Sequence, residues 1–277
     1  MIGTRRITRR SFLAAAGLTA AALALTACGG SASSTASSTA SSAASSTSAA
    51  AELTTVEAGK LTMATNATFP PYEMTTDSGE IEGIDVDTAK AIAEKLGLEL
   101  QIDDMDFDAA LLSVQQGKAD IVMAGVTVTD ERKAVMDFSD SYATGIQSII
   151  VPNDSDIASP DDLAGKKIGT QRGTTGYIYC SDDFGDDAVV AYDDGLTAVQ
   201  ALKNGQVDAV VIDNAPAKEY VAANPGLVIL DTSYAEEDYA IGMAKGSALE
   251  DAVNAALEEL KADGTLQAIV DKYINAN

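Results

Sequence analysis

Two ten-residue segments of the sequence follow the same pattern, and this repeat limits the folds that the chain can adopt. Gln115–Ala124 and Lys203–Ile212 begin 88 residues apart. Each contains the end of a helical pattern, a glycine, an aspartate and a short apolar run typical of a strand buried on both faces. Any two helix-to-strand turns share some of these features, but the closeness of the match favours two similar α/β lobes.

Strand and helix patterns alternate from Leu61 to the C-terminus. The predicted strands are 61–65, 98–102, 121–124, 167–170, 189–192, 207–212 and 228–230, with helices at 89–96, 109–116, 196–203 and 216–223. This alternation predicts α/β layering around largely parallel sheets. Ligands of such sheets bind beyond the carboxyl ends of the strands. Gly125 and Asp213 each come directly after a predicted strand, so we expect both of them at the edge of the sheet where a ligand binds.

The C-terminal region predicts one more helix. Ser247 and Glu250 have the spacing of a capping box. The residues Leu249, Val253, Leu257 and Leu260 would form its apolar face.

The first 28 residues are an export signal and are excluded from the fold. Four arginines precede an Ala-rich apolar stretch that is too short for a comfortable membrane span. The sequence Leu25-Thr26-Ala27-Cys28 resembles the lipobox of bacterial lipoproteins, in which the cysteine becomes the lipidated N-terminus. We therefore expect a signal peptide at 1–27 and an extracytoplasmic protein that Cys28 anchors to the membrane of a bacterium. Thr8–Leu13 also resembles a twin-arginine signal, and general secretion is an equal alternative.

Residues 28–51 predict a flexible linker, because every residue after Cys28 in this range is Gly, Ala, Ser or Thr. The net charge of −24 argues against binding to nucleic acid or directly to anionic lipid. The sequence has no histidine, which excludes Ser-His-Asp and Cys-His catalysis and His-based metal sites. No cofactor and no metal are expected. With Cys28 lipidated, Cys180 is a lone cysteine and is expected to be a packed side chain.

Only two arginines, Arg132 and Arg172, follow residue 27. Arg132 comes shortly after a very apolar segment in a strongly acidic chain. Its planar guanidinium suits bidentate capture of a carboxylate. The alternative is an exposed ion pair with one of its acidic neighbours.

Three stretches carry a resemblance to a known family: Ala64–Glu73, Gly83–Asp87 and Ala124–Arg132. From about Lys60 to its end, the chain resembles the extracellular solute-binding proteins, family 3, of polar amino-acid ABC transporters. Thr88 departs from that family's signature, which usually has an aliphatic residue there.

The resemblance implies a two-lobed α/β fold of the type II periplasmic-binding-protein class, with two hinge crossings. Lobe 1 would contain 52–141 and 244–277, and lobe 2 would contain 147–238. The hinges would lie near 142–146 and 239–243.

The resemblance also implies a ligand site between the lobes. Its residues would be Asn66, Phe69, Phe107, Gly125, Thr127, Arg132, Thr175 and Asp213. Arg132 would hold the ligand α-carboxylate with backbone amides near Gly125 and Thr127, and hydroxyls of Thr127 and Thr129 could help. Amides near Thr175, at a probable helix start, also favour an anion. Asp213 would take the α-ammonium group, or would instead cap a helix.

The remaining residues face the ligand side chain. Phe69 and Phe107 would sandwich it, and Asn66 stands where several relatives have an acid. The amino acid itself is therefore left open by the sequence.

The predicted function is capture of a free amino acid and its delivery to an ABC permease by a monomeric protein. One alternative is an enzyme on the same fold, such as a cyclohexadienyl or arogenate dehydratase. The absence of histidine counts against this enzyme. A tethered amino-acid sensor is another alternative.

Overall fold

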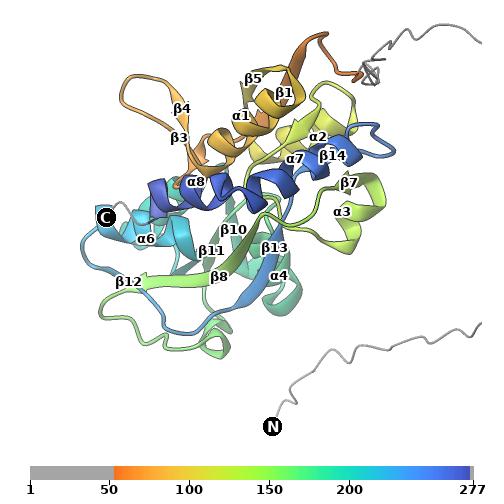
Figure 1. The fold of residues 1–277 in the computed structure, drawn as a ribbon. Helices are drawn as coiled ribbons and strands as arrows, with labels where there is room; N and C mark the ends of the chain where they lie inside the picture. The colour runs from red at the N-terminus through yellow and green to blue at the C-terminus, as the bar shows by residue number, and fades with distance from the viewer. Residues whose placement is uncertain (1–52, 275–277) are drawn as a thin grey trace, which may run out of the picture. The chain divides into compact units, whose positions relative to one another are not determined.

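The computed structural model describes residues 53–274 (Figure 1). The predicted signal peptide, Cys28 and the linker lie outside the described residues. Two large sheets, each with its own helices, form two lobes, and a small third sheet belongs to the first lobe. No helix within 53–274 is long and apolar enough to cross a membrane.

The first large sheet contains four strands that run in one direction and one strand that runs opposite to them. In spatial order these are β5 (Glu99–Asp104), β1 (Lys60–Thr65), β6 (Ile121–Val122), β14 (Gly242–Ala244) and β7 (Met136–Phe138). β14 runs antiparallel to both of its neighbours, so the sheet is mixed and not wholly parallel. The helices of this lobe are α1 (Ile84–Leu96), α2 (Phe107–Gln115), α3 (Asp130–Val135), α7 (Glu250–Ala262) and α8 (Thr265–Ile274).

The second large sheet is also mixed. Its strands are β10 (Val189–Tyr192), β9 (Ile168–Gln171), β11 (Ala209–Asp213), β8 (Ala143–Pro152), β12 (Leu227–Ile229) and β13 (Ala235–Tyr239). The long strand β8 pairs antiparallel with β11, β12 and β13. The helices here are α4 (Thr175–Phe184), α5 (Gly195–Lys203) and α6 (Asn214–Ala223), with short 3₁₀ turns η1 (Pro160–Leu163) and η2 (Asp186–Ala188). Cys180 is fully buried in α4, which confirms that it is a packed side chain.

The chain passes from β7 to β8 over residues 139–142 and returns from β13 to β14 over residues 240–241. The predicted crossings near 142–146 and 239–243 lie at the same two places in the chain, the first of them mostly inside β8. Figure 1 shows β8 and β13 side by side. A hinge motion at these crossings stays a prediction.

The internal repeat has the same structure in both copies. α2 leads through Gly117 and Asp120 into β6, and α5 leads through Gly205 and Asp208 into β11. Both glycines are in the left-handed region, with φ of 66° and 68°. Each aspartate accepts a hydrogen bond of 2.7 Å from the backbone of a neighbouring strand start.

The small sheet supplies part of the site. Its strands β2 (Thr68–Phe69), β3 (Glu73–Thr75) and β4 (Ile81–Glu82) are paired antiparallel. Phe69 and Glu73 are directly opposite each other in this sheet. Both side chains are buried, because the sheet lies against α1.

Candidate ligand-binding site

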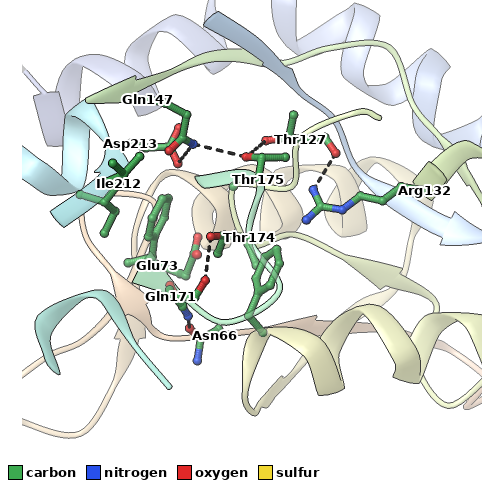
Figure 2. Close-up of a pocket in the computed structure, with 15 residues that line it drawn as sticks. Asn66, Glu73, Thr127, Arg132, Gln147, Gln171, Thr174, Thr175, Ile212 and Asp213 are labelled. Carbon is green, nitrogen blue, oxygen red and sulfur yellow. Dashed lines mark hydrogen bonds between the residues drawn. The ribbon is translucent and has the colours of Figure 1, made fainter. Parts of the chain in front are cut away.

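A pocket lies between residues of the two lobes (Figure 2). It brings together all eight ligand-binding residues that the sequence analysis predicted. Seven further residues line it, namely Glu73, Ala124, Gln147, Gln171, Thr174, Val211 and Ile212.

Arg132 lies in α3 with its guanidinium directed toward the pocket (Figure 2). Its Nη1 donates to the carbonyl of Thr127 at 2.8 Å, and its Nη2 donates to the carbonyl of Gly173, in the other lobe, at 3.1 Å. The guanidinium carbon also stands 5.4 Å from the centre of the Phe107 ring. Burial lowers the pKa of Arg132. The predicted alternative, an exposed ion pair, is therefore wrong.

Thr129 has a different place from the one considered in the sequence analysis. Its hydroxyl accepts a hydrogen bond from the backbone N–H of Arg132 and caps α3. It therefore sets the start of the helix that carries the guanidinium. It does not line the pocket.

The segment that resembles the family signature holds the loop after β6. Asp85 in α1 is fully buried, and its Oδ2 accepts a hydrogen bond of 3.0 Å from the N–H of Gly125. Burial raises the pKa of Asp85 to about 6, and the bond from Gly125 opposes this shift. Gly83 permits the close approach of α1 to the backbone of Tyr72, because a Cβ at position 83 would lie 2.1 Å from the carbonyl oxygen of Tyr72.

Asp213 ends β11 in the second lobe. It stands at the N-cap position of α6, but its side chain makes no capping bond, so capping does not explain this aspartate. Its Oδ2 instead accepts a hydrogen bond of 2.8 Å from Gln147 Nε2. Burial raises the pKa of Asp213 to about 7, and the nearby charge of Glu237 acts in the same direction.

Three polar side chains gather at the lower part of the pocket in Figure 2. Gln171 Nε2 donates to Asn66 Oδ1 at 2.8 Å, and this bond joins the two lobes. Glu73 is fully buried, its carboxyl group lies against that of Asp85, with which it shares a hydrogen bond, and no N–H group among the described residues donates to it. Burial and the charge of Asp85 raise the pKa of Glu73 well above its usual value.

Glu73 ends the stretch Ala64–Glu73, but neither Glu73 nor Gln171 was among the residues predicted to bind a ligand. Glu73 could have been identified as a candidate site residue, because it is an acidic residue that directly follows an aromatic loop near the first strand, where burial of an acid is unusual. Gln147 carried no such signal, because it lies in the middle of an otherwise apolar strand.

The described residues contain no group of three or more Cys, Asp or Glu side chains placed to hold a metal ion. The lining groups are instead one guanidinium, two carboxylates, amides, hydroxyls and two aromatic rings. Such a set can bind a small molecule that carries charges of both signs.

Known proteins have a similar fold and a similar sequence. The model of the bacterial extracellular solute-binding proteins, family 3, matches residues 61–276. The arginine-, lysine-, histidine-binding protein ArtJ from Geobacillus stearothermophilus has a similar structure, with a TM-score of 0.75 and 34% identity, over 79% of this chain and 96% of that one.

Two curated relatives are similar in sequence. The arginine-binding extracellular protein ArtP of Bacillus subtilis is 34% identical, over 90% of this chain and 92% of the relative. The L-cystine-binding protein TcyJ of Escherichia coli is 33% identical, over 80% of this chain and 85% of the relative.

The fold is that of the two-lobed amino-acid-binding proteins. More particularly, the chain belongs to the bacterial extracellular solute-binding proteins, family 3. Its role is substrate binding, and its relatives are solute-binding proteins and not enzymes. The dehydratase alternative is therefore set aside.

Proposed function

We propose that this protein captures an amino acid with a cationic side chain, of the arginine type, and delivers it to an ABC permease. The observation that carries the proposal is Glu73. Glu73 is fully buried beside Asp85, and no N–H group within residues 53–274 donates to its carboxyl oxygens, so a cation in the pocket would let this carboxyl group ionise and would pair with it. Burying such a group is costly unless a cation pairs with it.

The α-groups of the ligand would be held at the other side of the pocket. Arg132 would pair with the α-carboxylate, and Asp213, which is buried and lines the pocket, would accept from the α-ammonium group. This leaves Glu73 for the ligand side chain. A guanidinium or ammonium group there would supply the missing positive charge.

The relatives support this ligand class, because ArtJ and ArtP are named for binding arginine or other cationic amino acids. Cystine, the ligand named for TcyJ, shows that the family is not confined to this class. Asn66 and Gln171 would close the far end of the site by their mutual hydrogen bond.

Delivery to the membrane is part of the proposal. The segment that resembles a lipobox would anchor Cys28 in the membrane, and the Ser/Ala-rich linker would let the binding domain reorient as a monomer. Mass spectrometry of the protein recovered from membranes tests the anchor, since a diacylglyceryl group on Cys28 is expected.

A thermal-shift experiment with each of the twenty amino acids tests the ligand. Ligand at a hundred times its Kd should stabilise the protein by about 2.7 kcal/mol. We expect arginine and other cationic amino acids to give the largest shifts. A flat response across the panel would overturn the proposal.

The substitution Glu73→Gln tests the role of Glu73 directly. It keeps the shape of the side chain and removes its charge, so affinity for arginine should fall by roughly tenfold or more, with a smaller effect on glutamine. Glu80→Gln, at an exposed position, is the matched control. Equal losses for arginine and glutamine would remove Glu73 from the side-chain subsite.

A further inference from the structure

Glu237 is a buried carboxylate that forms hydrogen bonds with residues lining the ligand site. It lies on β13, is 8% exposed, and does not line the pocket. Its Oε2 accepts hydrogen bonds from Thr175 Oγ1 at 2.9 Å, Gln147 Nε2 at 3.1 Å and Thr127 Oγ1 at 3.2 Å. All three donors line the pocket.

The three donors come from separate parts of the fold. Thr127 belongs to the loop after β6 in the first lobe, Gln147 to β8, and Thr175 is the first residue of α4 in the second lobe. One carboxylate oxygen therefore connects both lobes at the proposed ligand site. The adjacent Glu236 is exposed and has no comparable contacts, since the strand alternates its faces.

The chemistry of a carboxylate fixes the direction of these bonds. An ionised carboxylate only accepts, so the hydroxyls of Thr127 and Thr175 must donate their single hydrogens to Glu237. Thr175 Oγ1 also accepts from Gln147 Nε2 at 3.3 Å, so each hydroxyl keeps at least one lone pair for the pocket. Gln147 Nε2 shares its two hydrogens among Glu237, Asp213 and Thr175.

Glu237 also affects the charge balance of the site. Among the charges near Arg132, that of Glu237 contributes most to keeping the guanidinium protonated. The side chain of Tyr179 in α4 also interacts with Glu237, both by a hydrogen bond and through its charge. Burying this carboxylate is costly, and its hydrogen bonds from three pocket-lining donors and its attraction to Arg132 offset that cost.

We infer that Glu237 is a positioning residue of the ligand site, which orients Thr127, Thr175 and Gln147 so that hydroxyl oxygens face the ligand ammonium group. The inference rests on the proposed function for the identity of the ligand. It assigns the threonine hydroxyls to the ammonium group and leaves the ligand carboxylate to Arg132 and backbone amides.

Calorimetric titration of the purified protein with L-arginine tests this assignment. Glu237→Ala removes the shared acceptor, and the Kd should rise by about tenfold or more. Glu237→Gln keeps an accepting oxygen and should stay within about threefold of the unmodified protein. Glu236→Ala, its exposed neighbour, should leave the Kd unchanged. Glu237→Met fills the volume without an acceptor and replaces the alanine variant if that variant does not fold.

Unchanged affinity in Glu237→Ala, or an equal loss in Glu237→Gln, would overturn the inference. Amide hydrogen exchange of the ligand-free protein separates this failure from failure of the proposed function. Loss of Glu237 should speed exchange at 125–128 and at the start of α4, and loss of Glu236 should not. Faster exchange supports the positioning role even if arginine does not bind, and unchanged exchange overturns it.

Discussion

Arg132 has an unusual environment for an arginine in an acidic protein. The carbonyls of Thr127 and Gly173 hold its guanidinium from two lobes, and the Phe107 ring lies beside it. These neutral contacts orient the positive charge without neutralising it. The guanidinium group of Arg132 therefore remains able to pair with a ligand carboxylate.

Replacing Arg132 with lysine should weaken amino-acid binding by roughly tenfold to a hundredfold, because an ammonium group cannot make the same forked contacts. Calorimetric titration measures the change. Arg172→Lys is the matched control, since Arg172 is exposed and pairs only loosely with Asp193 at 3.5 Å. Equal effects of the two substitutions would contradict the role of Arg132.

The pKa of Asp213, raised by burial to about 7, predicts a pH dependence of binding. The ligand ammonium group needs the ionised carboxylate, so affinity for arginine should fall by about tenfold for each pH unit below about 7. Arginine keeps its own charges over this range. Titrations at pH 8, 7, 6 and 5 give the slope, and a constant Kd would contradict the prediction.

The same shift has the opposite effect on the stability of the ligand-free protein. The folded state holds the proton of Asp213 up to a pH of about 7, whereas the unfolded chain releases it near 3.8. The folded state binds more protons in this window, so the free energy of unfolding should rise as the pH falls from 7 toward 4. Urea unfolding at several pH values measures this rise, and Asp213→Asn should reduce it.

The sequence indicated the residues that come directly after a strand or within a recognisable loop. Arg132 and Asp213 could be predicted in this way. Gln147 and Glu237 could not, because both lie inside strands and reach the site only through the antiparallel pairing of β8 with β11 and β13. Such pairings between distant segments leave no local pattern in the sequence.

At the scale of the elements, the two repeated turns differ in burial. Asp120 is buried and accepts bonds of 2.7 Å from the N–H groups of Val56 and Thr62. Asp208 is exposed and accepts one bond, from the N–H of Lys167. The two aspartates have the same position in the repeat, but we expect Asp120 to contribute more to the free energy of unfolding than Asp208.

Asp120→Ala should lower the free energy of unfolding by about 2 kcal/mol, because it leaves the buried N–H of Thr62 and the partly buried N–H of Val56 unpaired. Asp208→Ala should cost about 1 kcal/mol or less, since water can replace its bond. Urea unfolding compares the two variants. Equal losses would show that burial does not distinguish the turns.

The predicted elements were found where periodicity was strong, as in the face of α7 that buries Val253 and Leu257. The prediction of largely parallel sheets was only partly right, because β8, β13 and β14 run antiparallel to their partners. The capping box was wrong. Ser247 accepts from the N–H of Leu249 instead, and α7 begins at Glu250 without a side-chain cap.

At the scale of the whole molecule, the lobes meet through a few polar contacts. Tyr220 in α6 donates its hydroxyl hydrogen to the carbonyl of Thr68 in the first lobe. Tyr220 is buried but does not line the pocket. It can therefore stabilise contact between the lobes without touching a ligand.

Tyr220→Phe should release a bound amino acid about threefold faster, with the association rate unchanged, because it removes a contact present when the lobes meet. Stopped-flow measurement of both rates tests this, with Tyr192→Phe on β10 as the control. A change confined to the association rate would show that this contact does not hold the lobes together.

The loop that carries the proposed carboxylate site is also hydrogen-bonded to the second crossing. Thr127 forms a β-bridge with Tyr239, Val128 donates to the carbonyl of Asp238 at 3.0 Å, and Ala240 donates to that of Val126 at 3.1 Å. We therefore expect the loop and the crossing to shift together when a ligand binds. A fluorescent label near the crossing should then change its emission when the pocket is occupied.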